Sequence, residues 1–111
     1  MTTQHKDLSS GRWNNLSFAE QMANIGSEVG RAISWRNKDN QGYSQLALDR
    51  ALELLDLTVS DKKNILRLRE VLRTREALAD YLFFDNSYHS TDAIWQSYFL
   101  AFNYAARIGK N

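Results

Sequence analysis

The chain of 111 residues contains no cysteine and no proline, and only five of its residues are glycine. The absence of cysteine excludes disulfides and thiolate metal sites. Proline and glycine break helices and form tight turns, so a chain with so little of either favours long helices over many short strands. A chain of this length can bury a core without covalent cross-links, and we expect a single all-α domain.

Long apolar runs and a strong net charge are also missing. No stretch of about 18 apolar residues is present, so no membrane-spanning helix is predicted. Residues 1–10 lack the apolar segment of a secretory signal, and we therefore expect a cytoplasmic protein. The formal net charge is only +1, so binding to nucleic acid would require a local basic patch.

Apolar residues recur every three or four positions in four segments, which predicts helices at about residues 17–35, 43–58, 62–84 and 91–108. Ser17 and Glu20 have the spacing of a capping box at the start of the first helix. Residues 1–12 are polar and aperiodic, and we expect them to form a flexible N-terminal arm that Trp13 docks onto the rest. Because the connections are short, the predicted fold of residues 13–111 is a single-domain, antiparallel, up-and-down four-helix bundle.

The last predicted helix is apolar around most of its circumference. It has only a narrow polar stripe and contains five aromatic residues: Trp95, Tyr98, Phe99, Phe102 and Tyr104. A helix of this kind is buried on most sides, either by its own chain or by a partner. We therefore expect it to be the most buried of the four helices, in a homodimer or larger homo-oligomer. Alternatively, the N-terminal arm covers its surplus face.

A row of small residues follows one edge of the first predicted helix: Ala19, Ala23, Gly26 and Gly30. Glycine in a helix interior costs roughly 1 kcal/mol relative to alanine, so two of them on one edge indicate a need for space. That space would be filled by a closely packed neighbouring helix or by a ligand lying against the backbone. Close helix packing is the preferred interpretation.

Three charged residues fall on or beside apolar faces and are candidate binding residues: Glu28, Arg50 and Arg75. A buried guanidinium needs a partner, because an unpaired charge in a low dielectric is strongly unfavourable. Glu28 is a candidate partner, and so are Asp49 and Asp80. The arginines would form internal salt bridges or extend to the rim of the bundle. Alternatively, they would line an anion pocket between helices or pair across an oligomer interface.

Cations gather in two further places. Trp35 and Arg36 lie where the first helix meets a polar connection, and they could stack on bases or contact phosphate; alternatively, Trp35 folds back over the core. Residues 62–75 carry six cations, among them Arg73 and Arg75, against a single acid. Acidic residues of the second predicted helix could pair with these cations inside the chain. Binding of nucleic acid or a nucleotide through these residues is the alternative function.

Four acidic residues on the second and third predicted helices are spaced as E-x-x-D and E-x-x-x-D: Glu53 and Asp56, then Glu76 and Asp80. This arrangement resembles the all-α nucleoside triphosphate pyrophosphohydrolases, small bundles in which helical acids hold Mg²⁺ against the triphosphate. The resemblance covers about a third of the chain and implies a magnesium-dependent hydrolase as a second alternative. The second spacing departs from the family pattern, and these acids point away from the apolar faces, whereas a metal site needs converging acids.

No catalytic motif is found. The two histidines, His5 and His89, have neither E-x-x-H nor H-E-x-x-H spacing, and no phosphate-binding glycine loop or G-x-S-x-G motif is present. We therefore expect no catalytic residues, no metal and no cofactor. The leading hypothesis is a small non-enzymatic interaction or scaffold protein. It would self-associate and bind a protein partner through aromatic and Arg-lined surfaces, with Trp95, Phe99 and Tyr104 as rim aromatics.

Overall fold

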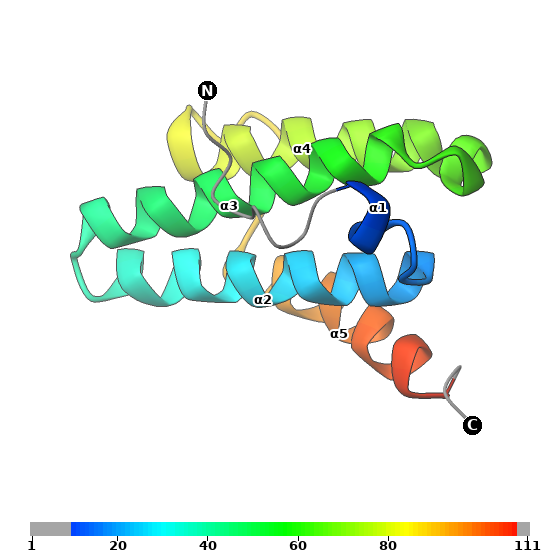
Figure 1. Ribbon diagram of the computed structural model, residues 1–111. Helices are drawn as coiled ribbons and strands as arrows, with labels where there is room; N and C mark the ends of the chain where they lie inside the picture. The colour runs from blue at the N-terminus through cyan, green and yellow to red at the C-terminus, as the bar shows by residue number, and fades with distance from the viewer. Residues whose placement is uncertain (1–9, 109–111) are drawn as a thin grey trace.

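The structure is a computed structural model that describes residues 10–108, in which helices are present and β-strands are not (Figure 1). In chain order the elements are α1 (Ser10–Trp13), α2 (Phe18–Asn37), α3 (Gln41–Ser60), the 3-10 helix η2 (Lys62–Arg67), α4 (Leu68–Phe83) and α5 (Asp92–Ile108). The predicted all-α class is confirmed. Within the described range, no helix is long and apolar enough to cross a membrane.

α2 is the central helix of a single globule. α3 packs along one side of α2 and α5 along another, while α4 packs against α3 (Figure 1). α2, α3 and α4 run in alternating directions, and α5 starts behind α2 and diverges from it toward the C-terminus. α2 is therefore the main helical neighbour of α5, and α4 reaches α5 through side chains such as Glu70, which accepts from Tyr98 at 2.8 Å.

The expectation that the last helix would be the most buried is wrong. α2 and α3 each bury seven side chains, whereas α5 buries only Trp95 and Phe99. Most of residues 100–108 are exposed. The apolar periodicity correctly indicated a helix that is apolar nearly all round, but it did not show whether the same chain supplies a neighbour on every side.

The third predicted helix is divided in two. Residues 62–67 form the tighter η2, and α4 begins at Leu68. In η2 the polar Asn64 faces inward and is 3% exposed, whereas the apolar Ile65 is 67% exposed. The Asn64 amide donates to the backbone carbonyl of Thr58 at 3.0 Å, which holds the chain in a tight turn directly after α3. The other predicted helix bounds agree with α2, α3 and α5 to within two residues.

Trp13 anchors the start of the described chain. Residues 1–9 of the predicted arm lie outside the described residues, and Ser10–Trp13 form α1. Trp13 is fully buried, and its indole N–H donates to the hydroxyl of Thr58 in α3 at 3.0 Å. The expected docking of Trp13 is therefore confirmed, and it takes place on α3.

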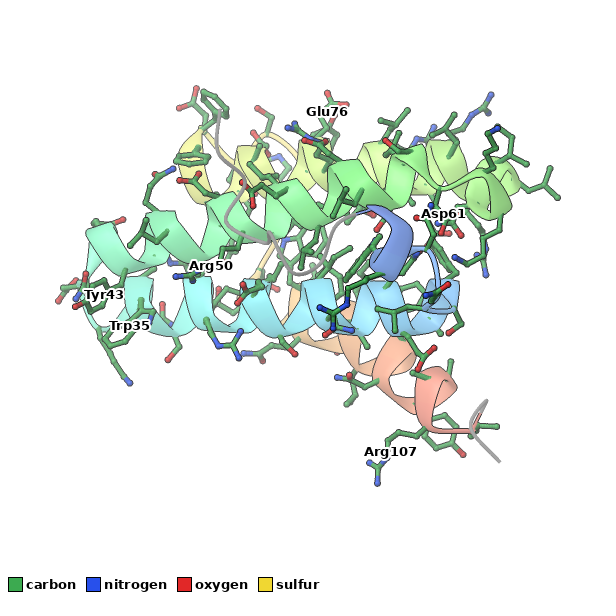
Figure 2. All side chains as sticks on the ribbon, in the orientation of Figure 1. Trp35, Tyr43, Arg50, Asp61, Glu76 and Arg107 are labelled. Carbon is green, nitrogen blue, oxygen red and sulfur yellow. The ribbon has the colours of Figure 1, made fainter. Side chains whose placement is uncertain are left out.

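Trp13 belongs to a buried network of hydrogen bonds that joins α1, α2, α3 and η2. The Gln21 amide donates to the carbonyl of Trp13 at 3.1 Å and to Asp61 at 2.8 Å, and its oxygen accepts from the Asn64 amide at 2.8 Å. Asp61, labelled in Figure 2, also accepts from the backbone N–H and the ammonium of Lys63. Burial raises the pKa of Asp61, but these hydrogen bonds outweigh it and hold the pKa below its usual value.

The substitution Gln21→Ala is expected to lower the free energy of unfolding by about 2–4 kcal/mol, because it removes one hydrogen bond each from the buried side chains of Asp61 and Asn64 and leaves a cavity in place of a fully buried side chain. Gln45→Ala removes the same side chain from an exposed position in α3. That control should change stability by less than about 0.5 kcal/mol. Urea denaturation followed by circular dichroism measures both variants. Equal effects would show that the network does not hold this end of the fold together.

Gly26 and Gly30 of α2 have different surroundings. A Cβ atom added to Gly26 would lie 2.6 Å from the Cβ of Phe99, which is closer than van der Waals contact allows. A Cβ atom added to Gly30 would meet no atom of the described residues within 4 Å. Gly26 therefore provides the close helix packing expected of the small-residue row, whereas Gly30 borders open space.

The two glycines should respond oppositely to alanine. Gly26→Ala is expected to lower the free energy of unfolding by about 1–3 kcal/mol, since the new methyl group overlaps Phe99 and displaces α5. Gly30→Ala should raise it by about 0.5–1 kcal/mol, since alanine loses less backbone entropy in a helix and has room at this position. Chemical unfolding of both variants measures the difference. A stabilised Gly26→Ala protein would contradict the packing of α5 on α2.

Candidate functional site

Glu28 and Arg50, two of the predicted site residues, form an interhelical salt bridge between α2 and α3. Glu28 is 6% exposed, and one of its carboxylate oxygens lies 4.0 Å from Nε of Arg50, which is labelled in Figure 2. The other oxygen pairs with Arg31, one turn further along α2. Of the three acids expected as candidate partners for the arginines, Glu28 is the one that pairs with Arg50.

Arg75 pairs with an acid that the sequence analysis did not single out for it. Its Nε donates to Asp56 of α3 at 2.8 Å, and both side chains are partly exposed, so the pair is worth about 1 kcal/mol or less. Asp80, one of the expected partners, is buried and accepts from the backbone N–H groups of Ser87 and Tyr88 at 2.9 and 3.1 Å. Burial raises the pKa of Asp80, but these hydrogen bonds outweigh it and lower the pKa. Asp80 therefore shapes the loop after α4.

Trp35 packs across the turn between α2 and α3. Its ring meets that of Tyr43 edge-on at a centroid distance of 4.8 Å (Figure 2), and the ammonium of Lys38 lies 5.3 Å from its centroid. Trp35 is half-buried, whereas Tyr43 is exposed. The indole is thus covered in part by its own chain.

Arg36 joins α2 to both α4 and α5. Its guanidinium donates to Asp92 of α5 at 2.6 Å and to the hydroxyl of Tyr81 in α4 at 3.2 Å. The Asn37 amide and the Tyr81 hydroxyl also donate to Asp92. Partial burial raises the pKa of Asp92, but the hydrogen bonds from Tyr81, Asn37 and Arg36 outweigh it and lower the pKa. This cluster holds the first turn of α5 in place.

The basic run at residues 62–75 is partly neutralised within the chain. Arg73 is exposed and borders an apolar hollow of about 260 Å³ between α4 and α5, which Ile94 and Tyr98 also line. Internal pairing, the expected state of the run, is observed for three of its cations: Lys63 with Asp61, Arg67 with Glu70 and Arg75 with Asp56.

The acids suggested for a metal site do not converge. Among residues 10–108, no group of three or more histidine or carboxylate side chains is placed to hold a metal ion. Glu76, labelled in Figure 2, accepts from the hydroxyl of Tyr88 at 3.0 Å, while Asp56 pairs with Arg75. The contacts described for Asp56, Glu76 and Asp80 are thus with residues of the same chain.

The side of α5 opposite Trp95 and Phe99 is an exposed, uncharged surface, and we name it the outer face of α5. Its four large apolar side chains are 52–68% exposed. Of the rim aromatics expected from the sequence, Tyr104 lies on this face, whereas Trp95 and Phe99 are buried. A helical wheel reveals both sides of α5 but not which one turns outward. The outer face consists of Ile94, Ser97, Leu100, Ala101, Tyr104, Ala105 and Ile108.

A groove of about 180 Å³ separates α5 from α2 beside Gly30. Its apolar lining includes Ile33, Trp95, Phe99 and Leu100. The indole N–H of Trp95 is buried, and the described residues provide no acceptor for it. Because Leu100 lines the groove and also lies on the outer face of α5, the two form one continuous apolar surface.

No protein-family model, curated protein or solved structure matches this chain. The chemistry of the described residues is therefore the basis for a functional proposal. Among the predicted site residues, Glu28, Arg36, Arg50 and Arg75 make ionic contacts between helices. The outer face of α5 differs from them, because its large side chains are apolar and still exposed to water.

The hydrogen bonds to Asp92 predict a pH-dependent contribution to stability. Because the pKa of Asp92 is lower in the folded state, the carboxylate stabilises the fold above its unfolded-state pKa of about 3.9, and this contribution is lost as the pH falls through the folded-state pKa. Asp92→Asn should lower the free energy of unfolding by about 1 kcal/mol at neutral pH, and the difference from the wild type should shrink below about pH 4.

Urea denaturation between about pH 7 and pH 3 measures this difference. Asp85→Asn removes the same charge from an exposed loop position, so it controls for the change in net charge. Its stability should follow that of the wild type. A deficit of Asp92→Asn that stays constant at every pH would contradict the role of the ionised carboxylate.

Proposed function

We propose that this protein is a non-enzymatic helical interaction module that self-associates through the outer face of α5. One observation carries the proposal: Ile94, Leu100, Tyr104 and Ile108 lie on the same side of one helix, and each is more than half exposed. A contiguous apolar patch of this kind on a globular protein is typical of an interaction site.

The energetics of association favour this surface. Burial of apolar area is worth roughly 25 cal/mol per Å², so covering four large side chains on each of two copies contributes several kcal/mol. That gain has to exceed the cost of association, which is at least about 4 kcal/mol. The seven residues of the outer face carry no charge, so burying them requires no desolvation of ions.

The remaining contacts support the proposal by fixing the orientation of α5. Trp95 and Phe99 attach the helix to α2, and Arg36 holds its first turn through Asp92. In this proposal α5 is the fourth helix of an up-and-down bundle and remains open on its outer side. A protein partner in the cytoplasm would meet the same face, with Arg73 at its edge beside Ile94.

The two alternative functions expected from the sequence would each require side chains to break contacts that they make within the chain. Binding of nucleic acid through Trp35 and Arg36 would require Arg36 to leave Asp92 and Tyr81. A magnesium site of the pyrophosphohydrolase type would require Asp80 to give up its hydrogen bonds to the loop after α4. The outer face of α5 can bind a partner without breaking any such contact.

Light scattering on the 111-residue chain tests self-association. The wild type should show a molar mass that rises with concentration from the 12.8 kDa monomer toward twice that value and does not fall at high salt, because the contact is apolar. Tyr104→Glu places a charge on the outer face and should yield a monomer at every concentration.

Leu66→Glu is the matched control, because Leu66 is also apolar and is 94% exposed, but lies in η2. This variant should associate like the wild type. Circular dichroism establishes that both variants remain folded. A wild type that is monomeric at high concentration, or a Tyr104→Glu variant that associates normally, would refute the proposal.

A further inference from the structure

The outer face of α5 has a nearly symmetric pattern about Ala101. Ile94 lies seven residues before Ala101 and Ile108 seven residues after it. Ser97 and Ala105, both small, lie four residues before and after it. All five side chains are exposed. At 100° per residue they fall within an arc of about 80°, so they form one stripe along the helix.

A pattern of this kind suits a two-fold symmetric contact between identical helices. In such a contact, each residue meets the residue placed equally far from the axis on the other copy. Around Ala101 in antiparallel helices, Ile94 would meet Ile108 of the second copy, and Ser97 would meet Ala105. The small residues at the centre let the two helix backbones approach closely, and the isoleucines close both ends.

The ends of α5 favour the antiparallel direction. Asp92 in the first turn is already paired with Arg36 of its own chain, whereas Arg107 lies in the last turn and extends away from the body of the protein (Figure 2). Antiparallel helices pair opposite ends of the helix dipoles. Parallel helices would instead bring like ends of the dipoles, and the two Arg107 side chains, to the same end of the pair.

The hollow between α4 and α5 is a second feature that fits this arrangement. It has a volume of about 260 Å³, and Ile94 lines it together with Arg73, Thr74, Ala77, Ser90, Trp95 and Tyr98. Ile108 lies at the end of the protruding half of α5 and is 52% exposed. In an antiparallel pair, Ile108 of the second copy reaches Ile94 and thus the mouth of this hollow.

From these observations we infer that a second copy of this chain packs antiparallel along α5, about a two-fold axis at Ala101. This inference rests on the proposed function and specifies its partner and its geometry. The 17 residues of α5 span only about 25 Å at 1.5 Å per residue. A contact of that length falls below about 1,200 Å² of buried surface, so the dimer is reversible and forms as concentration rises.

Because the chain contains no cysteine, single introduced cysteines report the geometry directly. In the 111-residue chain, Ala101→Cys should form a disulfide-linked dimer under mild oxidation, since facing residues at the axis would lie within the roughly 4.4–6.8 Å between Cα atoms that a disulfide requires. The rate should exceed that of the exposed control Leu66→Cys by on the order of ten-fold, because paired thiols have a high effective concentration.

A mixture of Ile94→Cys and Ile108→Cys proteins tests the direction of the helices. The antiparallel arrangement predicts that the mixture forms disulfides between the two variants faster than either variant forms them with itself. Faster self-linking of both variants would show a parallel pair and overturn the inference. Non-reducing electrophoresis and intact mass separate these products.

The proposed function and this inference can fail separately. If light scattering shows a dimer but Ala101→Cys links no faster than Leu66→Cys, another surface forms the dimer. The geometry inferred here is then wrong, while self-association stands. If the wild type is monomeric at every concentration, both are wrong.

Discussion

The contact between Phe99 and the backbone of Gly26 is the constraint on which the exposed surface of this protein depends. Any side chain at position 26 would overlap Phe99, so the absence of one allows α5 to approach α2 closely. This approach turns Trp95 and Phe99 inward and leaves the opposite side of α5 in water. The hydrogen bonds from Arg36 to Asp92 fix the first turn of the same helix. The Tyr98 hydroxyl adds a hydrogen bond to Glu70 of α4 at 2.8 Å, while α5 diverges from α2 toward the C-terminus (Figure 1).

Many polar side chains of this protein form hydrogen bonds or salt bridges with other residues of the same chain. At one end, Gln21 connects Trp13, Asp61 and Asn64 in a buried network, and such a network stabilises a fold only when its members are satisfied. Elsewhere, salt bridges connect α2 with α3 and α3 with α4. Since the net charge of the chain is only +1, long-range electrostatic attraction of charged partners is weak.

Local signals in the sequence predicted a large part of this structure. The helix bounds followed from apolar periodicity, and the capping box is present, with hydrogen bonds of 2.9 and 3.1 Å between Ser17 and Glu20. Glu28 was one of three candidate partners for the arginines near apolar faces, because a buried guanidinium needs a counter-charge, and it pairs with Arg50. Asp56 was not identified as the partner of Arg75, since exposed acids on a helix are equivalent until the neighbouring helix is placed. The inward turn of Asn64 was missed for a similar reason, because its partners Gln21 and Thr58 lie in other helices.

The sequence by itself determined the all-α class, the positions of the helices and the apolar character of α5 on nearly all sides, because these properties depend on residues a few positions apart. Only the tertiary structure decided which side of α5 is covered and which is exposed. That outcome depends on the fit between Gly26 and Phe99, two residues on different helices, and on the reach of Arg36 to Asp92. Periodicity within one helix carries no information on such contacts, because it describes the faces of that helix and not the neighbours that cover them.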